Sequence, residues 1–258
     1  MIELSACIEM LFEPESPDFV QRLALAQDAG FTTIEFWTWE DKPVDELGKE
    51  LQRLDLAAHL FLVRASGPLT DRRYHAEFLA QLERAAALAS SWEVPYLALF
   101  CGDDLPDVSR EVQEANVRSA LEASVAIADR YERSLLIEPL NSLVDHPGYF
   151  LTTTPQAIRM IEQVGSPTLG LAYDAYHSIT MGERPADVLA GHFDLVSHVQ
   201  IADVPGRGEP GSGTVDWTAF LGWLAGQGYT GPVGLEYRPS VPTVESLTYI
   251  RDCVEALG

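Results

Sequence analysis

Short apolar runs and longer amphipathic stretches alternate along the whole chain. The apolar runs, which predict β-strands, lie at residues 2–8, 32–37, 56–62, 95–101, 134–139, 168–174, 195–201 and 231–237. Apolar residues at the three-and-four spacing of helices mark stretches between them, among them residues 19–30, 78–92, 112–131, 217–228 and 243–256. This strand–helix repeat, eight units long, predicts a parallel sheet with right-handed crossovers. It favours a closed (β/α)8 barrel, the TIM barrel, over an open doubly wound sheet.

The repeat continues without a linker or a change in composition, so we expect a single domain over residues 1–258. No GxGxxG motif follows the first predicted strand, which argues against a dinucleotide-binding fold. Residues suited to N-capping stand where four helices are expected to begin. They are Ser16, Thr154, Asp216 and Thr243.

Acidic residues outnumber basic residues by 39 to 17, which gives the chain a net charge of −22. A surface with this excess repels a phosphate backbone and an anionic membrane, so the composition argues against nucleic acid and membranes as partners. No apolar run approaches the roughly 18 residues of a membrane span, and we expect a cytoplasmic protein. Cys7, Cys101 and Cys253 are far apart in sequence and are expected to be reduced thiols in the core.

Four consecutive predicted strands end in residues with side-chain oxygens. These residues are Glu138, Asp174, Gln200 and Glu236. In TIM barrels the active site lies at the carboxyl ends of the strands, so the four side chains are expected to meet there. Three carboxylates at one buried site repel one another unless a cation lies between them, and three acids with one amide suit Mg²⁺ or Mn²⁺. Taken singly, each acid is better explained as a salt-bridge partner at a strand end.

Further polar residues near the strand ends are candidates for substrate contact. His177 follows the sixth predicted strand, and Arg207 lies in the glycine-rich loop after the seventh. A guanidinium suits a substrate carboxylate or hydroxyl. Glu35 and His59 face the barrel interior in one register of the early strands.

Period-two alternation in the seventh strand places His198 and Gln200 on one face and Val199 and Ile201 on the other. The polar pair therefore faces the barrel interior, with His198 in a supporting position deeper than Gln200. The two tryptophans of residues 37–39 form either an apolar wall over the substrate or part of the core. Core packing is the stronger expectation, because indole rings bury a large apolar area.

Glu138 and Glu236, on the fifth and eighth strands, are expected to flank a bound substrate. This arrangement suits proton transfer, because a metal that holds a carbonyl and its neighbouring hydroxyl acidifies the proton next to the carbonyl. One glutamate removes that proton to give an enediolate, and the other returns it at an adjacent or opposite position. The sequence therefore predicts an isomerase or an epimerase.

Four segments of the second half of the chain occur in a distinctive order. They are IEPLN (137–141), YDAYH (173–177), HVQIADVPGRGEPGSG (198–213) and GLEYRP (234–239). Together they resemble the hydroxypyruvate isomerase family of the xylose-isomerase-like TIM barrels. The resemblance implies that Glu138, Asp174, Gln200 and Glu236 hold a divalent metal, that the two glutamates are the acid–base pair, and that His177 and Arg207 contact the substrate.

Gln200 favours this family over the ketose 3-epimerases, which resemble it. Two departures from the family pattern border the expected pocket. The segment FLVRASGPLTD (61–71) replaces a longer loop after the third strand, and Cys7 stands where the family often has Asn. The resemblance therefore supports the catalytic residues more strongly than the substrate.

We expect a metal-dependent isomerase of a small hydroxy-keto acid or sugar, with hydroxypyruvate as the implied substrate. The alternatives among enzymes are a ketose 3-epimerase, or a decarboxylase or dehydratase of a sugar acid with the same metal site. A DNA-repair nuclease would need a histidine-rich zinc site and a basic groove, which six scattered histidines and the net charge of −22 oppose. A non-catalytic sugar-binding barrel is a further alternative. Barrels of this kind commonly associate, so a homodimer or homotetramer is expected.

Overall fold

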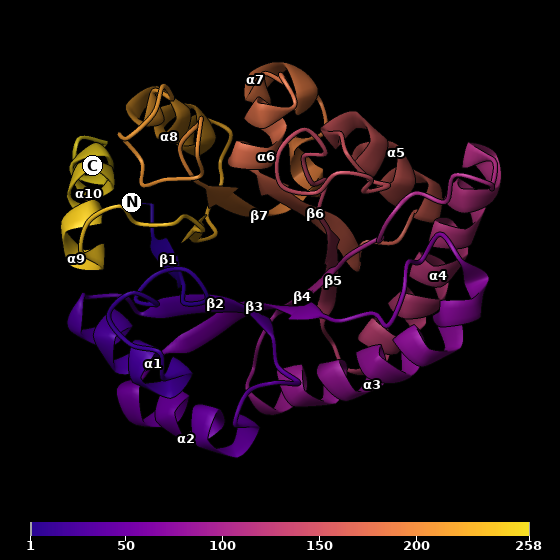
Figure 1. The fold of residues 1–258 in the computed structure, drawn as a ribbon, viewed down its shortest axis with the longest axis horizontal. Helices are drawn as coiled ribbons and strands as arrows, with labels where there is room; N and C mark the ends of the chain where they lie inside the picture. The colour runs from indigo at the N-terminus through magenta and orange to yellow at the C-terminus, as the bar shows by residue number, and fades with distance from the viewer. Residues whose placement is uncertain (1, 258) are drawn as a thin grey trace. The chain divides into compact units, whose positions relative to one another are not determined.

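Eight parallel strands form a closed barrel in the computed structural model, which describes residues 2–257 (Figure 1). In barrel order they are β1 (Leu4–Cys7), β2 (Thr33–Thr38), β3 (Ala57–Val63), β4 (Tyr96–Leu99), β5 (Ser134–Ile137), β6 (Leu169–Asp174), β7 (Val196–Ile201) and β8 (Val233–Leu235). Strand β1 pairs with both β2 and β8, which closes the sheet. Each strand overlaps its predicted run, and the (β/α)8 fold class is confirmed.

Helices alternate with these strands. They are α1 (Phe19–Asp28), α2 (Val44–Leu54), α3 (His75–Ser91), α4 (Arg110–Arg130), α5 (Thr154–Val164), α6 (Ala175–Thr180), α7 (Pro185–Val188), α8 (Trp217–Gly226), α9 (Thr243–Ser246) and α10 (Thr248–Glu255). Two 3-10 turns are η1 (Arg72–Tyr74) and η2 (Phe193–Leu195). The single helix expected over residues 243–256 is wrong, because α9 and α10 are separate. Hydroxyl groups of Ser246 and Thr248 donate to nearby carbonyls at this break, which competes with the helical backbone bonds.

Only one of the four expected N-caps is confirmed. Asp216 caps α8, where its carboxylate accepts a hydrogen bond from the first turn. At α1 the cap is Asp18 rather than Ser16, because the Asp18 carboxylate reaches two N–H groups of the first turn. Thr154 and Thr243 are the first residues inside α5 and α9. The N-cap positions of these helices are Thr153 and Pro242, one residue earlier than predicted.

Two compact units make up the chain, and each is discontinuous in sequence. The first contains the N-terminal segment up to Phe36, Lys42–His59 and the segment from His198 onward, and the second contains Trp37–Asp41 and Leu60–Ser197. The expectation of a single domain over residues 1–258 stays a prediction. The candidate site residues divide between the units. Glu138, Asp174 and His177 lie in the second unit, and Glu35, His59, Gln200, Arg207 and Glu236 lie in the first.

The interior of the second unit is packed by one apolar residue from each of four successive strands. Leu60 of β3, Ala98 of β4, Leu136 of β5 and Ala172 of β6 form this layer, and each is at most 5% exposed. Helices α3 and α4 run side by side along the outside of β4 and β5 (Figure 1). Large and small side chains thus alternate between neighbouring strands and fill the interior with packed atoms.

Cys7, Cys101 and Cys253 are buried free thiols, as predicted. The expectation of core packing is wrong for Trp37, which is 38% exposed, and Trp39 is also partly exposed. Strand β2 ends at Thr38, so both indoles lie where the chain leaves the sheet. None of the helices within residues 2–257 is long and apolar enough to cross a membrane.

Leu136→Ala is expected to lower the free energy of unfolding by about 2–5 kcal/mol, because truncation leaves a cavity in the packed layer. Urea unfolding measures this change. Leu143→Ala is the matched control, because Leu143 is 69% exposed, and a surface truncation changes the free energy by less than about 0.5 kcal/mol. Equal effects of the two substitutions would contradict the packing described for Leu136.

Candidate active site

Two carboxylates and a histidine form a compact buried group in the second unit. We call this group, Glu138, Asp174 and His177, the Glu138 cluster. Glu138 directly follows β5, Asp174 ends β6, and His177 lies in α6. Each has an atom able to bind a metal within 4.8 Å of such an atom in the other two. His177 Nε2 lies 3.5 Å from Asp174 Oδ2 and 3.9 Å from Glu138 Oε1.

The hydrogen bonds of His177 determine which ring nitrogen carries the proton. The backbone N–H of Asn141 donates to His177 Nδ1 at 3.2 Å, and Asn141 Nδ2 lies 2.7 Å from the same atom. A backbone N–H cannot accept, so Nδ1 is unprotonated and the neutral ring carries its proton on Nε2. A metal would need a lone pair on Nε2. His177 therefore presents a donor toward the two carboxylates and is not suited to be a ligand of a metal there.

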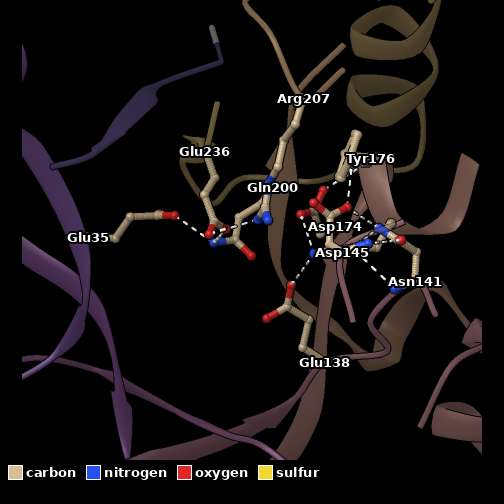
Figure 2. Close-up of polar contacts among 10 residues, drawn as sticks. Glu35, Glu138, Asn141, Asp145, Asp174, Tyr176, Gln200, Arg207 and Glu236 are labelled. Atoms are coloured by element: carbon tan, nitrogen blue, oxygen red, sulfur yellow. Dashed lines mark hydrogen bonds and ion pairs between the residues drawn. The ribbon is translucent and has the colours of Figure 1, made fainter. Parts of the chain in front are cut away.

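Asn141 is itself fixed by a network that sequence reasoning missed. Asp145 Oδ2 accepts from both Asn141 Nδ2 and the Tyr176 hydroxyl, each at 2.7 Å (Figure 2). Asn141 Oδ1 accepts from the backbone N–H groups of Val144 and Asp145, so the amide orientation is unambiguous. One sequence signal could have identified this network. Asn141, at the end of IEPLN, is a polar residue in a loop only three positions after the buried acid Glu138, and such loop residues often serve function.

An amide between two carboxylates forms the centre of a second group, in the first unit. This group, the Gln200 cluster, consists of Glu35, His198, Gln200, Arg207 and Glu236. Gln200 Nε2 donates to Glu35 Oε1 at 2.8 Å and to Glu236 Oε2 at 2.6 Å (Figure 2). Both donors of the amide are thereby used. Gln200 Oε1 is buried and has no hydrogen-bond partner among residues 2–257.

Glu35 is a carboxylate with 1% exposure. Its second oxygen, Oε2, lies 2.9 Å from His198 Nε2. Burial raises the pKa of Glu35, but His198 and the hydrogen bond from Gln200 outweigh this effect, and the net pKa is lowered. His198 and Gln200 thus contact the same carboxylate from one face of β7, as the period-two pattern predicts.

The ring of His59 lies beside the ring of His198, with centroids 5.1 Å apart and ring planes inclined at 47°. Burial, together with the neighbouring His198, lowers the pKa of His59 to about 4, although Glu35 opposes the shift. The ring is therefore neutral at neutral pH. The expected contact of His59 with a substrate stays a prediction, and a neutral ring would make it as a hydrogen-bond partner rather than a cation.

Arg207 Nη2 donates to Glu236 Oε1 at 3.0 Å (Figure 2). Its backbone is left-handed, with φ of 56°, which few non-glycine residues adopt. Two backbone bonds hold this conformation: its N–H donates to Asp203 O at 3.1 Å, and its carbonyl accepts from Arg238 N at 2.8 Å. The arginine is therefore held over Glu236 by its main chain as well as its side chain.

Asp203, which sequence reasoning left without a role, organises the loop that carries Arg207. Its side chain accepts four hydrogen bonds from the same loop and from the start of α8. Oδ1 accepts from Val204 N and Val215 N, at 2.8 and 3.2 Å, and Oδ2 accepts from Gly211 N and Trp217 Nε1, at 2.7 and 3.2 Å. Burial raises the pKa of Asp203, but the backbone N–H groups of Gly213, Val215 and Gly211 and the indole of Trp217 outweigh this effect, and the net pKa is lowered.

The same carboxylate explains a glycine in the motif. A Cβ added to Gly213 would lie 2.4 Å from Asp203 Oδ1 and equally close to Val204 O. No side chain fits there without displacing the carboxylate or the backbone. The glycine-rich tail of the motif therefore gives the backbone room to surround Asp203.

His177 is expected to show the tautomer with Nε2 protonated. Nitrogen-15 NMR of histidine-labelled protein at neutral pH measures this directly, and His177→Gln identifies the signal by its loss. His192, which is half-exposed, supplies an internal comparison of the opposite kind, because its Nδ1 lies 3.2 Å from Glu162 Oε1 and favours a proton on Nδ1. Protonation at Nδ1 would contradict the donor role of the Asn141 backbone.

Asp203→Asn is expected to destabilise the protein by roughly 2–4 kcal/mol, because the new NH₂ group faces buried donors that lose their acceptor. Asp216→Asn is the matched control, since asparagine caps a helix as well as aspartate does. A lowered pKa means that Asp203 stabilises the fold above its unfolded-state pKa of about 3.9. The difference between wild type and Asp203→Asn should therefore shrink as pH falls below that value. A difference in urea unfolding that does not change with pH would contradict this role.

Comparison with known proteins agrees with this fold. The family model of the xylose isomerase-like TIM barrel matches residues 23–253. A putative hydroxypyruvate isomerase of Mus musculus is 33% identical over 100% of this chain and 97% of that protein. The hydroxypyruvate isomerase of Escherichia coli K12 is 30% identical over 97% of this chain and 98% of that protein.

A crystal structure of an AP endonuclease, family 2, from Brucella melitensis superposes with a TM-score of 0.92. The two chains are 27% identical, and the match covers 98% of this chain and 99% of that one. The two relatives compared by sequence are both named as isomerases, and the chain is an isomerase enzyme. It belongs to the xylose isomerase-like TIM barrel family and, within it, to the hydroxypyruvate isomerases.

Proposed function

We propose that the protein is a divalent-metal-dependent isomerase of a small hydroxy-keto acid, acting by proton transfer between Glu138 and Glu236. One observation carries the proposal. Gln200 gives both amide donors to carboxylates, so its buried oxygen is left as an acceptor at the carboxyl end of β7. A buried carbonyl oxygen requires a donor or a cation. Because carboxylates lie next to this oxygen, a cation is the favoured partner, since it also lowers the repulsion between the carboxylates.

The donor set proposed for the metal is Glu138, Asp174, Gln200 and Glu236. These residues stand at the carboxyl ends of β5, β6, β7 and β8, which are consecutive in the barrel order. Three carboxylates and one amide are hard oxygen donors, which favours Mg²⁺ or Mn²⁺ over zinc. His177 is left out of this set because its Nε2 is the protonated nitrogen.

A divalent ion at this position would stabilise negative charge on the substrate oxygens when the proton next to the carbonyl is removed. Glu138 and Glu236 would exchange that proton with the substrate, one as base and the other as acid. The bond from Arg207 Nη2 to Glu236 Oε1 fixes the orientation of one of these carboxylates. The network around Asn141 fixes His177 so that its Nε2–H donates to a substrate oxygen.

Arg207 is also the group that we propose for the substrate carboxylate. A guanidinium has five N–H donors, so a bond to Glu236 and a contact with a carboxylate are compatible. Hydroxypyruvate, the substrate in the names of the mouse and Escherichia coli relatives, is accordingly the first substrate proposed. The net charge of −22 argues against DNA, although one structural neighbour is named as an AP endonuclease.

The segment after β3 that departs from the family pattern is anchored to the segment after β4. Leu69 N donates to Cys101 O at 2.9 Å, and Thr70 Oγ1 donates to Asp103 O at 2.8 Å. These two anchors lie at the end of the segment, and Arg64 Nη2 donates to Thr38 Oγ1 at 3.4 Å at its start. Residues 64–68 are where we propose that substrate preference differs from the relatives.

Glu236→Gln is expected to reduce deuterium incorporation from D₂O into hydroxypyruvate by about 10²–10⁴-fold, because an amide cannot act as acid or base. Mass spectrometry of the substrate and product pools, in protein loaded with Mn²⁺, measures the exchange. Wild-type protein treated with a chelator should lose exchange and regain it with Mn²⁺. Glu122→Gln, on the exposed side of α4, is the matched control and should exchange normally.

Exchange that survives Glu236→Gln would overturn the proposed acid–base pair, and exchange that is insensitive to the chelator would overturn the metal. The same assay with ketoses and sugar acids separates the alternatives. Deuterium on a carbon whose configuration inverts indicates a 3-epimerase. Loss of carbon dioxide or water from the substrate indicates a lyase.

A further inference from the structure

Glu35 is a buried carboxylate that does not belong to the donor set proposed for the metal. It lies in the middle of β2, and its two oxygens are divided between two residues of β7. Oε1 accepts from Gln200 Nε2 at 2.8 Å, and Oε2 lies 2.9 Å from His198 Nε2. With 1% of its surface exposed, it is less accessible than Gln200 or Glu236, each of which is 5% exposed.

The fold leaves room for this carboxylate at one position of β8. Gly234 is paired with Gln200 on one side and with Ser5 of β1 on the other. A Cβ added to Gly234 would lie 2.5 Å from both Glu35 oxygens. The Glu35 side chain therefore occupies the space over a glycine that lies directly beside Gln200.

A primary amide has two chemically opposite ends of nearly the same shape. Gln200 fits its position equally well by shape with either end turned toward Glu35, so hydrogen bonding decides between the two. Glu236 accepts from the same Nε2, but it is itself a proposed metal ligand whose charge the cation would share. Glu35 is the acceptor that stays outside the donor set and keeps the NH₂ group turned toward itself.

We propose that Glu35 is a positioning residue, which fixes the Gln200 amide so that its oxygen, and not its NH₂ group, faces the cation. The proposal rests on the proposed metal-dependent function. It assigns Glu35 a role other than the substrate contact expected from the sequence. Without the Glu35 carboxylate, only Glu236 accepts from the NH₂ group. The turned amide, with its N–H donors toward the positive charge, then becomes populated and the metal is bound less tightly.

Glu35→Gln is expected to weaken Mn²⁺ binding by about 10- to 100-fold, the usual cost of losing a group that orients a metal ligand. The amide introduced by this substitution must turn its own NH₂ group toward either His198 or Gln200, which removes one acceptor. Titration with Mn²⁺ alone, with the free ion followed by EPR, measures the dissociation constant without any activity assay. Glu3→Gln is the matched control. Glu3 also accepts hydrogen bonds, from the hydroxyl groups of Thr32 and Thr33, but these lie at the amino-terminal end of β2, outside the Gln200 cluster.

Gln200→Glu separates orientation from simple loss of charge. A carboxylate has two equivalent oxygens and cannot present a donor, so Glu35→Gln should not weaken Mn²⁺ binding when a glutamate occupies position 200. If Glu35 acted only through its negative charge, the loss would be the same in both backgrounds. Equal losses would overturn the proposal, as would an unchanged dissociation constant for Glu35→Gln.

Wild-type protein that fails to bind Mn²⁺ overturns the proposed function itself, whereas binding by wild type with equal losses in the two backgrounds overturns the role of Glu35 alone. If Glu35→Gln gives no cooperative unfolding transition, Gly234→Ala serves in its place, since it displaces the carboxylate without changing the cluster's chemistry. Gly234→Ala is expected to weaken Mn²⁺ binding when residue 200 is glutamine, and to leave it unchanged when residue 200 is glutamate. The reverse pattern contradicts the proposal.

Discussion

Like charges buried close together are the constraint on which the candidate site depends. In the Gln200 cluster, Glu35 and Glu236 are separated by an amide that donates to both, and each has a further partner, His198 or Arg207. In the Glu138 cluster the neighbouring group is the ring of His177, whose proton lies on the side of the carboxylates. Groups that carry N–H donors thus lie beside the carboxylates in both clusters and reduce their mutual repulsion. The proposed proton transfer requires one of the two glutamates in its charged form, as the base, and the other in its protonated form, as the acid.

The supporting groups lie on secondary structure or on loops that are themselves closely hydrogen-bonded. Asp174 ends β6 and caps α6, where its Oδ1 accepts from Tyr176 N at 2.8 Å. Strand β7 supplies both Gln200 and His198, so the spacing between an amide and its support follows from the strand itself. The main chain around Asp203 holds Arg207 in a left-handed conformation that costs energy in isolation. Backbone geometry therefore positions the candidate site residues, and side-chain bonds such as that from Arg207 to Glu236 set their final orientation.

The periodicity of the chain was sufficient to predict the barrel, because a parallel strand buried on both faces is an apolar run with clear limits. The positions of Glu138 and Gln200 at strand ends were predictable for the same reason. What Asn141, Asp145 and Asp203 do was not predictable, because these residues act through backbone N–H groups whose direction depends on loop conformation. Nor could the sequence distinguish a substrate contact from a support at Glu35. That distinction depends on Gly234, which lies almost 200 residues away along the chain.

The two loops that differ in their anchoring also differ in how freely their sequences can change. The loop after β7 encloses a charged side chain, and Gly213 has no space for a Cβ, so most replacements there disturb the main chain. The segment after β3 is attached through Leu69 and Thr70 at its far end, mainly by backbone atoms. Within this segment Gly67 is restricted, because a Cβ there would lie 2.6 Å from the ring of Tyr74, so sequence change is easiest at Ala65 and Ser66. The proposed function assigns substrate preference to this short segment, and directed evolution of this chain toward a new substrate would begin there.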